Sequence, residues 1–590
     1  MSSAAQPASS KDERSAAEAR ELVERAYHAF LQFQNFSQEQ VDRVIDAVAS
    51  AATAAAEKVA RLAVEETGYG VVADKVQKNL FSSQRVYQAL RGMKTVGIVR
   101  EDREQGIVEV AAPVGVVAAV LPSTNPTSTA IYKVLIALKG RNAIVLSPHP
   151  TAFRCTCEIT SIMRDAAIAA GAPADVICCF TTPTLAGTQE LMRHRRTSVI
   201  LATGGMGIVR AAYSSGKPAF GVGPGNVPAF IERSADIKKA VADVVFGKTF
   251  DNGTICSSEQ AIVAEEAIRD EITQELKRNG AYFLSEDEIQ RLGREMVNLE
   301  QHTINPKFVG KSAQRVAELA GFKVPDGTRV LVAPLSGVGR EHPLSAEKLS
   351  PVLALYFARD RQAAFDVCLA LLRFGGLGHT CAVHSRDDAA IREYGLKMPA
   401  GRIVVNSPAP LGSIGASTNL FPAMTLGCGA VGGNITSDNI SPMHLINLRR
   451  VAYETRPVTQ KQAVQVSAAA TPATCACQTK QPASAGVAVE GGVAPDRVAV
   501  ARAIERFLAQ KSGKPAPVAT PSAPSTTAKQ TAPAGPPVSR PKPRPVDFVS
   551  VEEIRAALKR KEKIVIGSKT IITPAARDLA AQHDVFTIAE

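Results

Sequence analysis

Apolar residues recur at helical spacing from residue 14 to residue 66, in long Ala-rich runs that end at Gly68-Tyr69-Gly70. Apolar side chains three or four positions apart share one face of a helix, and glycine commonly ends one. The pattern predicts a pair of helices in this region. The more polar residues 1–14 are expected to be disordered.

Further along, short runs rich in Val and Ile alternate with helix-like segments, first from Gly106 to about Ile231 and again from about Ala240 to Asn406. Residues 114–121 and 143–146 are two such runs. Strands that alternate with helices are typical of parallel βαβ units. The chain is therefore expected to be an α/β protein with two lobes, followed by Gly/Pro/Asn-rich loops over residues 407–447.

After Val451 the composition shifts to Ala, Thr, Gln, Pro and Ser, which cannot bury enough apolar surface to fold alone. Within this tail, Val500, Ile504, Phe507 and Leu508 fall on one helical face. The segment is short for an isolated helix in water, so we expect its apolar face to be covered. A partner protein and the chain's own body are equally consistent with the pattern.

A last module ends the chain, with a helix expected over 552–561, a strand over 563–566 and a helix start at Thr573. The order predicted along the chain is a disordered N-terminus (1–14), a first lobe with N-terminal helices (15–235), a second lobe (236–405), a return segment (406–450), a linker (451–494), an amphipathic helix (495–511), a second linker (512–545) and a small C-terminal module (546–590).

Composition narrows the class of protein. The chain has 590 residues, 45% of them hydrophobic, enough for several cores. Most of the net charge of +12 lies in the tail, where nothing resembles an RNA-binding module or a zinc finger, so we expect no nucleic-acid partner.

No apolar run is long enough to span a membrane, and residues 1–13 lack a secretory signal pattern. We expect a cytosolic protein with reduced thiols, and no metal site, since Cys475 and Cys477 have no second pair of ligands.

The segment from Phe250 to Gln260 carries the strongest chemical signal, because it places Cys256 after a glycine-bearing turn and before an apolar stretch. A reactive thiol needs a polar setting and a backbone that exposes its sulfur, and Asn252-Gly253-Thr254 can supply both. Cys428 fits either a reactive or a structural role. The remaining cysteines of the two lobes lie in or beside apolar segments and are expected to be buried fillers: Cys155, Cys157, Cys178, Cys179, Cys368 and Cys381.

Asn125 is the candidate partner of Cys256. A thiolate that adds to a carbonyl group creates an oxyanion, which needs donors such as a side-chain amide and a backbone N–H. Asn125 follows a strongly apolar strand, where open α/β sheets place their ligands, although in isolation a simple turn-forming role is the favoured explanation. Gly221, Gly223 and Gly225 lack the last glycine of a phosphate-binding fingerprint, and we interpret them as positions of close backbone approach.

Together these motifs resemble the aldehyde dehydrogenase superfamily, and within it the CoA-acylating branch found in bifunctional aldehyde-alcohol dehydrogenases and bacterial microcompartments. The resemblance covers roughly residues 15–450. The motifs that carry it occur in family order: residues 122–128 (PSTNPTS), 147–150 (SPHP), 201–205 (LATGG), 221–226 (GVGPGN), the Cys256 segment, 347–352 (EKLSPV) and 378–380 (GHT).

The resemblance implies a Rossmann-like cofactor lobe, a catalytic lobe that contains Cys256, and an oligomerisation arm that builds dimers or tetramers. The segment before Gly106 and residues 404–406 are the two candidates for the arm. Cys256 would be the nucleophile, with Asn125 and the Cys256 backbone N–H as the oxyanion hole. The residues that would line the nicotinamide cleft are Ser123, Thr124, Asn125, Pro126, Thr127, Ser128, Gly205 and Gly223, with Glu347 on a cofactor ribose.

Four further residues are of second rank. Ser147 and His149 stand where the wider superfamily places a lysine near the adenosine ribose, which favours NAD over NADP. His379 would contact a cofactor phosphate or orient the site. Glu259 would assist proton transfer or, alternatively, orient the loop.

Hydrolytic family members carry a glutamate at the position of Gly221. Without that base, water attacks the thioester slowly, so the acyl group can pass to coenzyme A. The resemblance therefore implies oxidation of a small aldehyde, such as acetaldehyde or propionaldehyde, to acyl-CoA. The alternatives are a hydrolytic enzyme that releases the free acid and a catalytically retired scaffold.

Microcompartment aldehyde dehydrogenases often carry a short amphipathic encapsulation helix beyond a flexible linker, and residues 495–511 resemble one. This similarity implies a place inside a bacterial microcompartment, with shell or cargo proteins as partners. Residues 572–580 resemble small segments of other microcompartment enzymes, notably phosphate acyltransferases.

Overall fold

The computed structural model describes residues 10–298, 303–456, 546–560, 562–573 and 585–588, with Ala576 and Ala580. The chain divides into two compact units, Met1–Ala470 and Thr471–Glu590, and each is described by itself. The amphipathic helix expected over 495–511, the linker over 512–545, most of the linker over 451–494 and the Cys475/Cys477 pair lie outside the described residues.

Three helices open the first unit, where the pattern predicts two: α1 (Lys11–Phe33), α2 (Gln38–Ala54) and α3 (Ala56–Thr67). Helix α1 begins inside the segment expected to be disordered, because Ser10 and Glu13 form a capping box at its start. The pattern joins α2 and α3 into one helix because only Ala55 separates them, and its apolar spacing continues across the break. Gly68 ends α3 with a left-handed backbone, as expected. Helices α4 (Val72–Leu80) and α5 (Val86–Leu90) follow.

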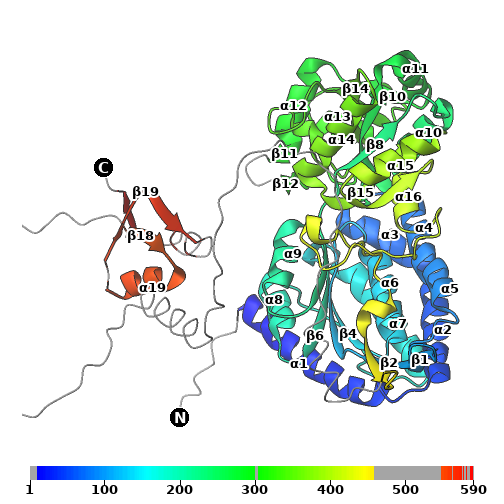
Figure 1. Cartoon of the computed structure of the whole chain (residues 1–590), viewed down its shortest axis with the longest axis vertical. Helices are drawn as coiled ribbons and strands as arrows, with labels where there is room; N and C mark the ends of the chain where they lie inside the picture. The colour runs from blue at the N-terminus through cyan, green and yellow to red at the C-terminus, as the bar shows by residue number, and fades with distance from the viewer. Residues whose placement is uncertain are drawn as a thin grey trace, which may run out of the picture. The chain divides into compact units, whose positions relative to one another are not determined.

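The first lobe is built on a five-stranded parallel sheet with the order β5-β4-β3-β6-β7 (Figure 1). The order reverses between β3 and β6, and ligands of open α/β sheets bind outside the carboxyl ends of strands at such a point. The strands are β3 (Val116–Val120), β4 (Ala143–Ser147), β5 (Ile177–Cys179), β6 (Thr197–Thr203) and β7 (Ala219–Val222). The helices between them are α6 (Pro126–Lys139), α7 (Phe153–Ala169), α8 (Leu185–Arg193) and α9 (Met206–Tyr213).

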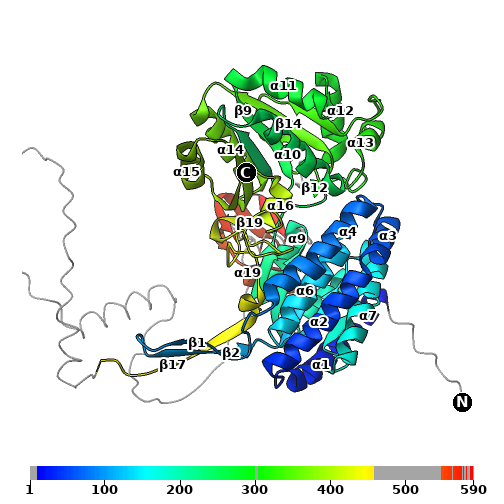
Figure 2. The ribbon, with the colours of Figure 1, turned by 90° about the vertical axis from the view of Figure 1, so that its right-hand side faces the viewer.

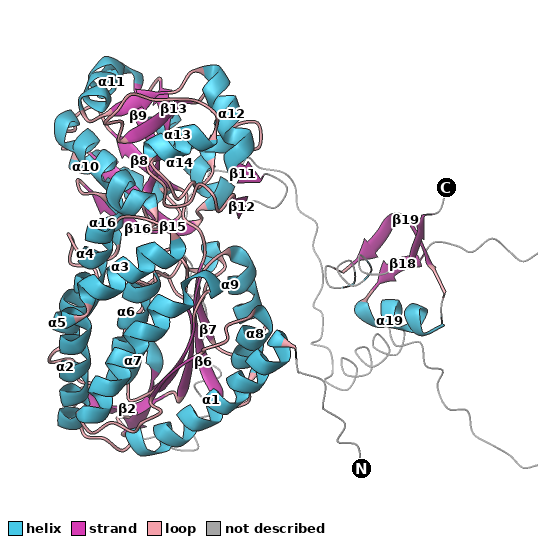
Figure 3. Ribbon diagram, turned by 180° about the vertical axis from the view of Figure 1, so that it is seen from behind, coloured by secondary structure: helices cyan, strands magenta, loops and turns pink. Residues whose placement is uncertain are grey.

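The second lobe holds a seven-stranded parallel sheet with the order β10-β13-β14-β9-β8-β15-β16. Its strands are β8 (Val227–Ile231), β9 (Glu259–Glu265), β10 (Ala281–Phe283), β13 (Val330–Pro334), β14 (Val352–Ala358), β15 (Gly378–His384) and β16 (Ala400–Val405). Helices lie on both sides of the sheet (Figure 3): α10 (Ile237–Thr249), α11 (Arg269–Arg278), α12 (Glu286–Met296), α13 (Ala313–Leu319), α14 (Arg361–Gly375), α15 (Asp388–Lys397) and α16 (Ala409–Ser413).

The predicted division into two α/β lobes is confirmed, but the boundary at residue 235 is misplaced by one strand. Strand β8 pairs with β9 and β15 and so belongs to the second lobe. Fully buried parallel strands are apolar throughout, so β8 has no feature that assigns it to one sheet rather than the other. A short ladder of β11 (Val297–Asn298) with β12 (Thr303–Ile304) also belongs to this part of the chain.

A three-stranded antiparallel sheet extends away from both lobes (Figure 2). It joins β1 (Gly97–Asp102) to β2 (Ile107–Pro113) and β2 to β17 (Ile446–Ala452). The segment before Gly106 is thus in the protruding sheet, whereas Val404 and Val405 lie in β16, so the second candidate for an arm is wrong. Strand β17 also extends past residue 451, so the predicted linker starts too early, because β2 supplies a partner that composition does not show.

The second unit contains a small parallel sheet with the order β18-β19-β20. Strand β18 (Val546–Val549), helix α19 (Val551–Arg560), strand β19 (Ile564–Ile572) and strand β20 (Phe586–Ile588) follow in sequence. The predicted helix and strand are confirmed, although β19 runs six residues beyond its predicted end at Ile566. Most of the helix expected after Thr573 lies outside the described residues.

Candidate active site

Cys256 follows a turn with an uncommon backbone. Helix α10 ends at Thr249, and Asp251, Asn252 and Gly253 then take positive φ angles of 48°, 52° and 72°. Such a conformation costs about 1–3 kcal/mol at a non-glycine residue, and Asp and Asn accept it more readily than most. The side chain of Asn252 holds the turn by donating to the Gly310 carbonyl, 2.9 Å away. The sequence prediction of a turn before the nucleophile is confirmed.

A cavity of about 570 Å³ opens where Cys256 meets the carboxyl ends of β3, β4 and β6. This size is typical of small-molecule sites. Nine of the residues singled out from the sequence line it: Ser123, Thr124, Asn125, Ser147, His149, Gly205, Gly223, Cys256 and Glu347. Residues from both lobes therefore meet at one site.

Three predicted lining residues do not line this cavity. Pro126, Thr127 and Ser128 form the first turn of α6 and are buried. Thr127 donates instead to the side chain of Asn79, at 2.8 Å. Because a helix returns to the same face after about four residues, the residue that follows Asn125 into the cavity is Thr129. The sequence analysis misses Thr129 because it expects residues 123–128 to form a loop along the cavity, whereas α6 already begins at Pro126.

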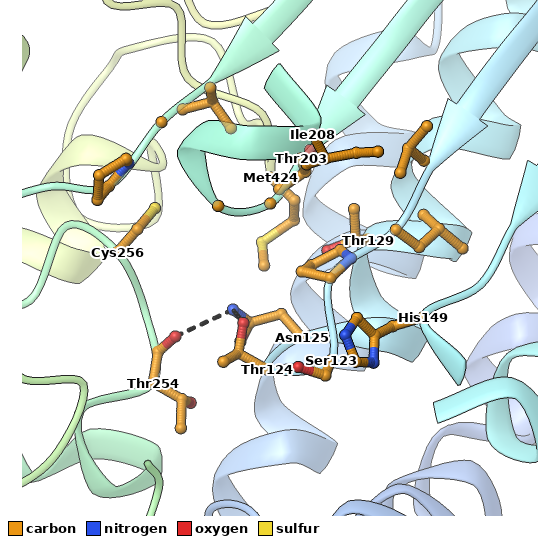
Figure 4. A pocket seen from close by; sticks show the side chains of 18 of the residues that line it. Ser123, Thr124, Asn125, Thr129, His149, Thr203, Ile208, Thr254, Cys256 and Met424 are labelled. Carbon is orange, nitrogen blue, oxygen red and sulfur yellow. Dashed lines mark hydrogen bonds between the residues drawn. The ribbon is translucent and has the colours of Figure 1, made fainter. Parts of the chain in front are cut away.

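The Asn125 side chain faces the turn that carries Cys256 (Figure 4). Its amide nitrogen donates to the Thr254 carbonyl and to the Thr124 hydroxyl, each 3.2 Å away. Asn125 occupies the position before α6, yet its side chain makes no capping hydrogen bond. The amide is therefore directed across the boundary between the lobes and does not stabilise the end of its own helix.

Cys256 is half-buried, and its electrostatic setting favours the neutral thiol. Burial, together with Glu347 and Cys428, raises the pKa of Cys256 to about 12, while Arg402 opposes this shift. Burial also raises the pKa of Glu347 to about 7. A group that accepts the proton of Cys256 is therefore needed for nucleophilic attack.

Gly225 fits the predicted close approach of the backbone. A β-carbon there would lie 2.1 Å from the Cys256 carbonyl oxygen and 3.1 Å from the ring of His379. The backbone N–H of Gly225 also donates to the Glu347 carboxylate, at 3.1 Å. This glycine thus lets three candidate residues gather at one point.

His379 and Glu259 lie behind the cavity. His379 is buried at the start of β15, where its Nδ1 lies 3.0 Å from the Thr380 hydroxyl. Burial, assisted by Arg402, lowers the pKa of His379 to about 3, so its ring is neutral. Glu259 is buried at the start of β9 and accepts a hydrogen bond from the Ala409 N–H at 2.6 Å. Burial raises the pKa of Glu259 to about 8.

The sequence gives no indication of one charged cluster beneath the site. Lys75, Lys78 and Asp251 are buried together, with both ammonium groups on one carboxylate oxygen. The spacing of the two lysines places them on one face of α4, but nothing links them to Asp251, which lies 173 residues after Lys78. Other missed lining residues follow β5 or β6 or lie in the return segment: Thr184, Leu185, Thr188, Ile208, Met424 and Leu426.

The cysteines other than Cys256 differ from expectation at two positions. Cys155, Cys178, Cys368 and Cys381 are buried, as predicted, and Cys428 is buried too. Cys157 and Cys179, however, are only half-buried and bring their sulfur atoms within 3.5 Å of each other. Within the described residues, no three His, Cys, Asp or Glu side chains gather as a metal site. No helix among those described has the length and apolar character to cross a membrane.

The residues of the cavity fit a nicotinamide dinucleotide. The cavity lies at the point where the strand order reverses, and the first turn of α9, which begins after Gly205, offers backbone N–H groups for a phosphate. Among the described residues, those that line the cavity include hydroxyl groups and Glu347 for sugar contacts, but no lysine or arginine.

This architecture and site are those of a two-lobed dehydrogenase whose cavity is lined by a cysteine, Cys256. The model of the aldehyde dehydrogenase family matches residues 4–416, and the chain belongs to that family. The bifunctional aldehyde-alcohol dehydrogenase of Escherichia coli is 45% identical over 441 residues, which are 74% of this chain and 49% of that protein. The chain spans about half the length of the first curated relatives it matches.

Solved structures share the fold. An acetylating aldehyde dehydrogenase from Geobacillus thermoglucosidasius is 50% identical with a TM-score of 0.74, and the match covers 76% of this chain and 99% of that one. A propionaldehyde dehydrogenase from Rhodopseudomonas palustris, with bound CoA and an acylated cysteine, is 27% identical with a TM-score of 0.66. The match covers 74% of this chain and 97% of that one. A second propionaldehyde dehydrogenase, from a fucose-utilisation microcompartment of Clostridium phytofermentans, is 29% identical with a TM-score of 0.67. This match also covers 74% of this chain and 97% of the other.

Proposed function

We propose that this chain is a CoA-acylating aldehyde dehydrogenase that oxidises a small aliphatic aldehyde, of the acetaldehyde or propionaldehyde class, to an acyl-CoA with NAD. The observation that carries the proposal is the meeting of Cys256 and Asn125 in one cavity. A relative of the same fold holds CoA and an acylated cysteine, which supports the same chemistry here.

The cycle begins when the Cys256 thiolate adds to the aldehyde carbon. The Asn125 amide and the Cys256 backbone N–H donate to the oxyanion that forms. NAD, held by Ser123, Thr124 and Glu347 of the cavity, would supply the hydride acceptor, and Cys256 is left as a thioester. The sulfur of CoA then attacks the thioester carbon, the Cys256 thiolate leaves, and the CoA thiol proton is released. One aldehyde, one NAD and one CoA thus give one acyl-CoA, one NADH and one proton.

Gly221 argues against the hydrolytic alternative. Its N–H donates to the Tyr213 hydroxyl at 3.0 Å, and a β-carbon at residue 221 would lie 2.8 Å from Val209. The position therefore has no room for the glutamate of hydrolytic relatives. Water lacks a base there, and the thioester persists until CoA arrives.

The adenosine end of the cavity supports NAD over NADP. Ser147 bonds to the Thr188 hydroxyl at 2.8 Å, and partial desolvation lowers the pKa of His149, so neither side chain supplies the permanent charge of a lysine for a 2′-phosphate. We further propose a homo-oligomer built through the sheet of β1, β2 and β17, whose Ile98 and Val451 are exposed, as is Tyr453 directly after β17.

The test of the reaction follows NADH formation from propionaldehyde and NAD, with and without CoA. The proposal expects sustained turnover with CoA and a single burst without it. Equal turnover without CoA would identify water as the acceptor. Cys256→Ala should abolish both the burst and the sustained turnover. Unchanged activity in this variant would support the scaffold alternative.

We also propose that the protein works inside a bacterial microcompartment, with residues 495–511 as the encapsulation helix. The pattern of this segment and the microcompartment origin of one relative support the proposal. Deletion of 495–511 should leave turnover intact and abolish co-sedimentation with shell particles. Unchanged co-sedimentation would favour the alternative in which the helix docks on its own chain.

A further inference from the structure

Lys78 makes contacts that the proposed reaction has not yet used. It is 2% exposed and donates to three groups: the Asn125 amide oxygen, the Asp251 carboxylate and, at 3.4 Å, the Thr254 hydroxyl. Asn125 belongs to the first lobe, while Asp251 and Thr254 belong to the turn before Cys256. One ammonium group therefore touches both halves of the proposed oxyanion site.

The contact with Asn125 fixes which end of the amide faces the turn. An amide has one accepting and one donating end, and a lysine ammonium can only donate. With its oxygen on Lys78, the Asn125 side chain must present its N–H groups to the side of Thr254. A positive charge on the oxygen also polarises the amide and strengthens its N–H groups as donors.

Charge balance around Asp251 does not require Lys78. Lys75 is equally buried and lies 3.0 Å from the same carboxylate oxygen. The half-buried Asp74 on the same helix accepts from the Asp251 N–H at 2.7 Å, and burial raises the pKa of Asp74, which weakens its demand for a second cation. Burial lowers the pKa of Lys78 to about 8, a sign that its burial is costly. Buried ion pairs contribute little net stability, so stability alone does not explain a second lysine.

We propose that Lys78 is a positioning residue, whose ammonium group orients the Asn125 amide toward the Cys256 turn and ties it there through Asp251 and Thr254. The inference rests on the proposed role of Asn125 as an oxyanion donor. Lys78 itself does not line the cavity.

Lys75 provides a matched control because it shares the helix, the burial and the carboxylate but donates to the Thr124 carbonyl, 3.0 Å away, and not to Asn125. Loss of one oxyanion donor costs about 10²–10³-fold in kcat. We expect Lys78→Met to lower kcat by about 10-fold to 100-fold, with little change in KM for NAD or CoA. Lys75→Met should cost clearly less. Lys78→Gln keeps a donor for the Asn125 oxygen and should recover part of the loss.

The decisive measurement is a double-mutant cycle in the CoA-dependent NADH assay. If Lys78 acts through Asn125, Lys78→Met should cost less than about twofold when Asn125 is already alanine. The inference would be overturned if Lys78→Met lowered kcat by the same factor with and without Asn125. It would also be overturned if Lys75→Met lowered kcat as much as Lys78→Met does, and in either case only a structural role would remain. Thermal unfolding checks each variant, and if Lys78→Met fails to fold, the same cycle with Lys78→Gln decides. A parent enzyme without CoA-dependent turnover would instead refute the proposed function.

Discussion

The carbonyl oxygen of Cys256 occupies the space in which a side chain at Gly225 would begin, 2.1 Å from the position of an added β-carbon. The two residues lie on neighbouring segments that enter β8 and β9. Because a real β-carbon does not come this close to an oxygen, the turn that carries Cys256 can lie here only against a glycine. This contact couples the residue at position 225 to the placement of Cys256.

Gly225→Ala is therefore expected to displace the Cys256 turn and with it the Cys256 backbone N–H, the proposed oxyanion donor. Misplacement of reacting groups by about 1 Å costs on the order of 100-fold in rate, and we expect a fall of that size in CoA-dependent kcat. Gly395→Ala is the control, because its added β-carbon meets only a methyl group of Ile403, at 3.9 Å. This helical substitution should leave turnover unchanged. Wild-type turnover in Gly225→Ala would show that the turn tolerates displacement.

The thiol of Cys256 should react slowly at neutral pH in the absence of ligands. Since its pKa is raised to about 12 by burial, the thiolate fraction increases about tenfold for each pH unit below that value. The rate at which iodoacetamide alkylates Cys256, followed by mass spectrometry of its peptide, should therefore rise about 100-fold from pH 7 to pH 9. A plateau reached by pH 8 would contradict this expectation. Glu347→Gln should raise the rate, because Glu347 contributes to the raised pKa.

Glu259 should make the protein less stable as the pH rises. Its pKa is raised by burial from 4.5 to about 8, so the folded state keeps a proton that the unfolded state loses. The stabilising effect is complete below pH 4.5 and is lost progressively up to pH 8. Thermal unfolding of Glu259→Gln should show a smaller loss of Tm across this range than the parent. Glu271→Gln, at an exposed carboxylate of α11, should keep the parent's profile. A parallel profile for Glu259→Gln would show that another group governs this pH range.

Local patterns predict the lobes, the turn and nine of the residues that line the cavity, since the strands, glycines and loops concerned have recognisable sequence patterns of their own. The alternation of Val-rich runs with helices predicts two parallel sheets, and Asn125 follows a strand as expected. Contacts between residues far apart in the chain have no such local sequence pattern. Strand β8 is as apolar as the strands of either sheet, and Lys78 meets Asp251 only because α4 packs beneath the Cys256 turn.

The contact between Cys157 and Cys179 is another long-range contact that the sequence does not predict, and it leads to a last prediction. Cys157 on α7 and Cys179 on β5 are both in apolar segments, yet their sulfur atoms lie 3.5 Å apart and both residues are only half-buried. A hydrogen bond from Cys179 lowers the pKa of Cys157, so Cys157 is the better nucleophile of the two. We expect diamide, which takes up two hydrogens from a dithiol, to join these two residues in a disulfide that dithiothreitol reverses.

Peptide mapping after alkylation would identify the crosslink. Cys155→Ser and Cys178→Ser, at the buried neighbours of the pair, should leave the crosslink in place, whereas Cys157→Ser or Cys179→Ser should abolish it. If diamide instead links Cys178 to either residue, the backbone between α7 and β5 moves enough to change which sulfur atoms meet. Because Thr184 and Leu185 of the cavity follow β5 closely in the chain, NADH formation before and after oxidation would show whether this link reaches the active site.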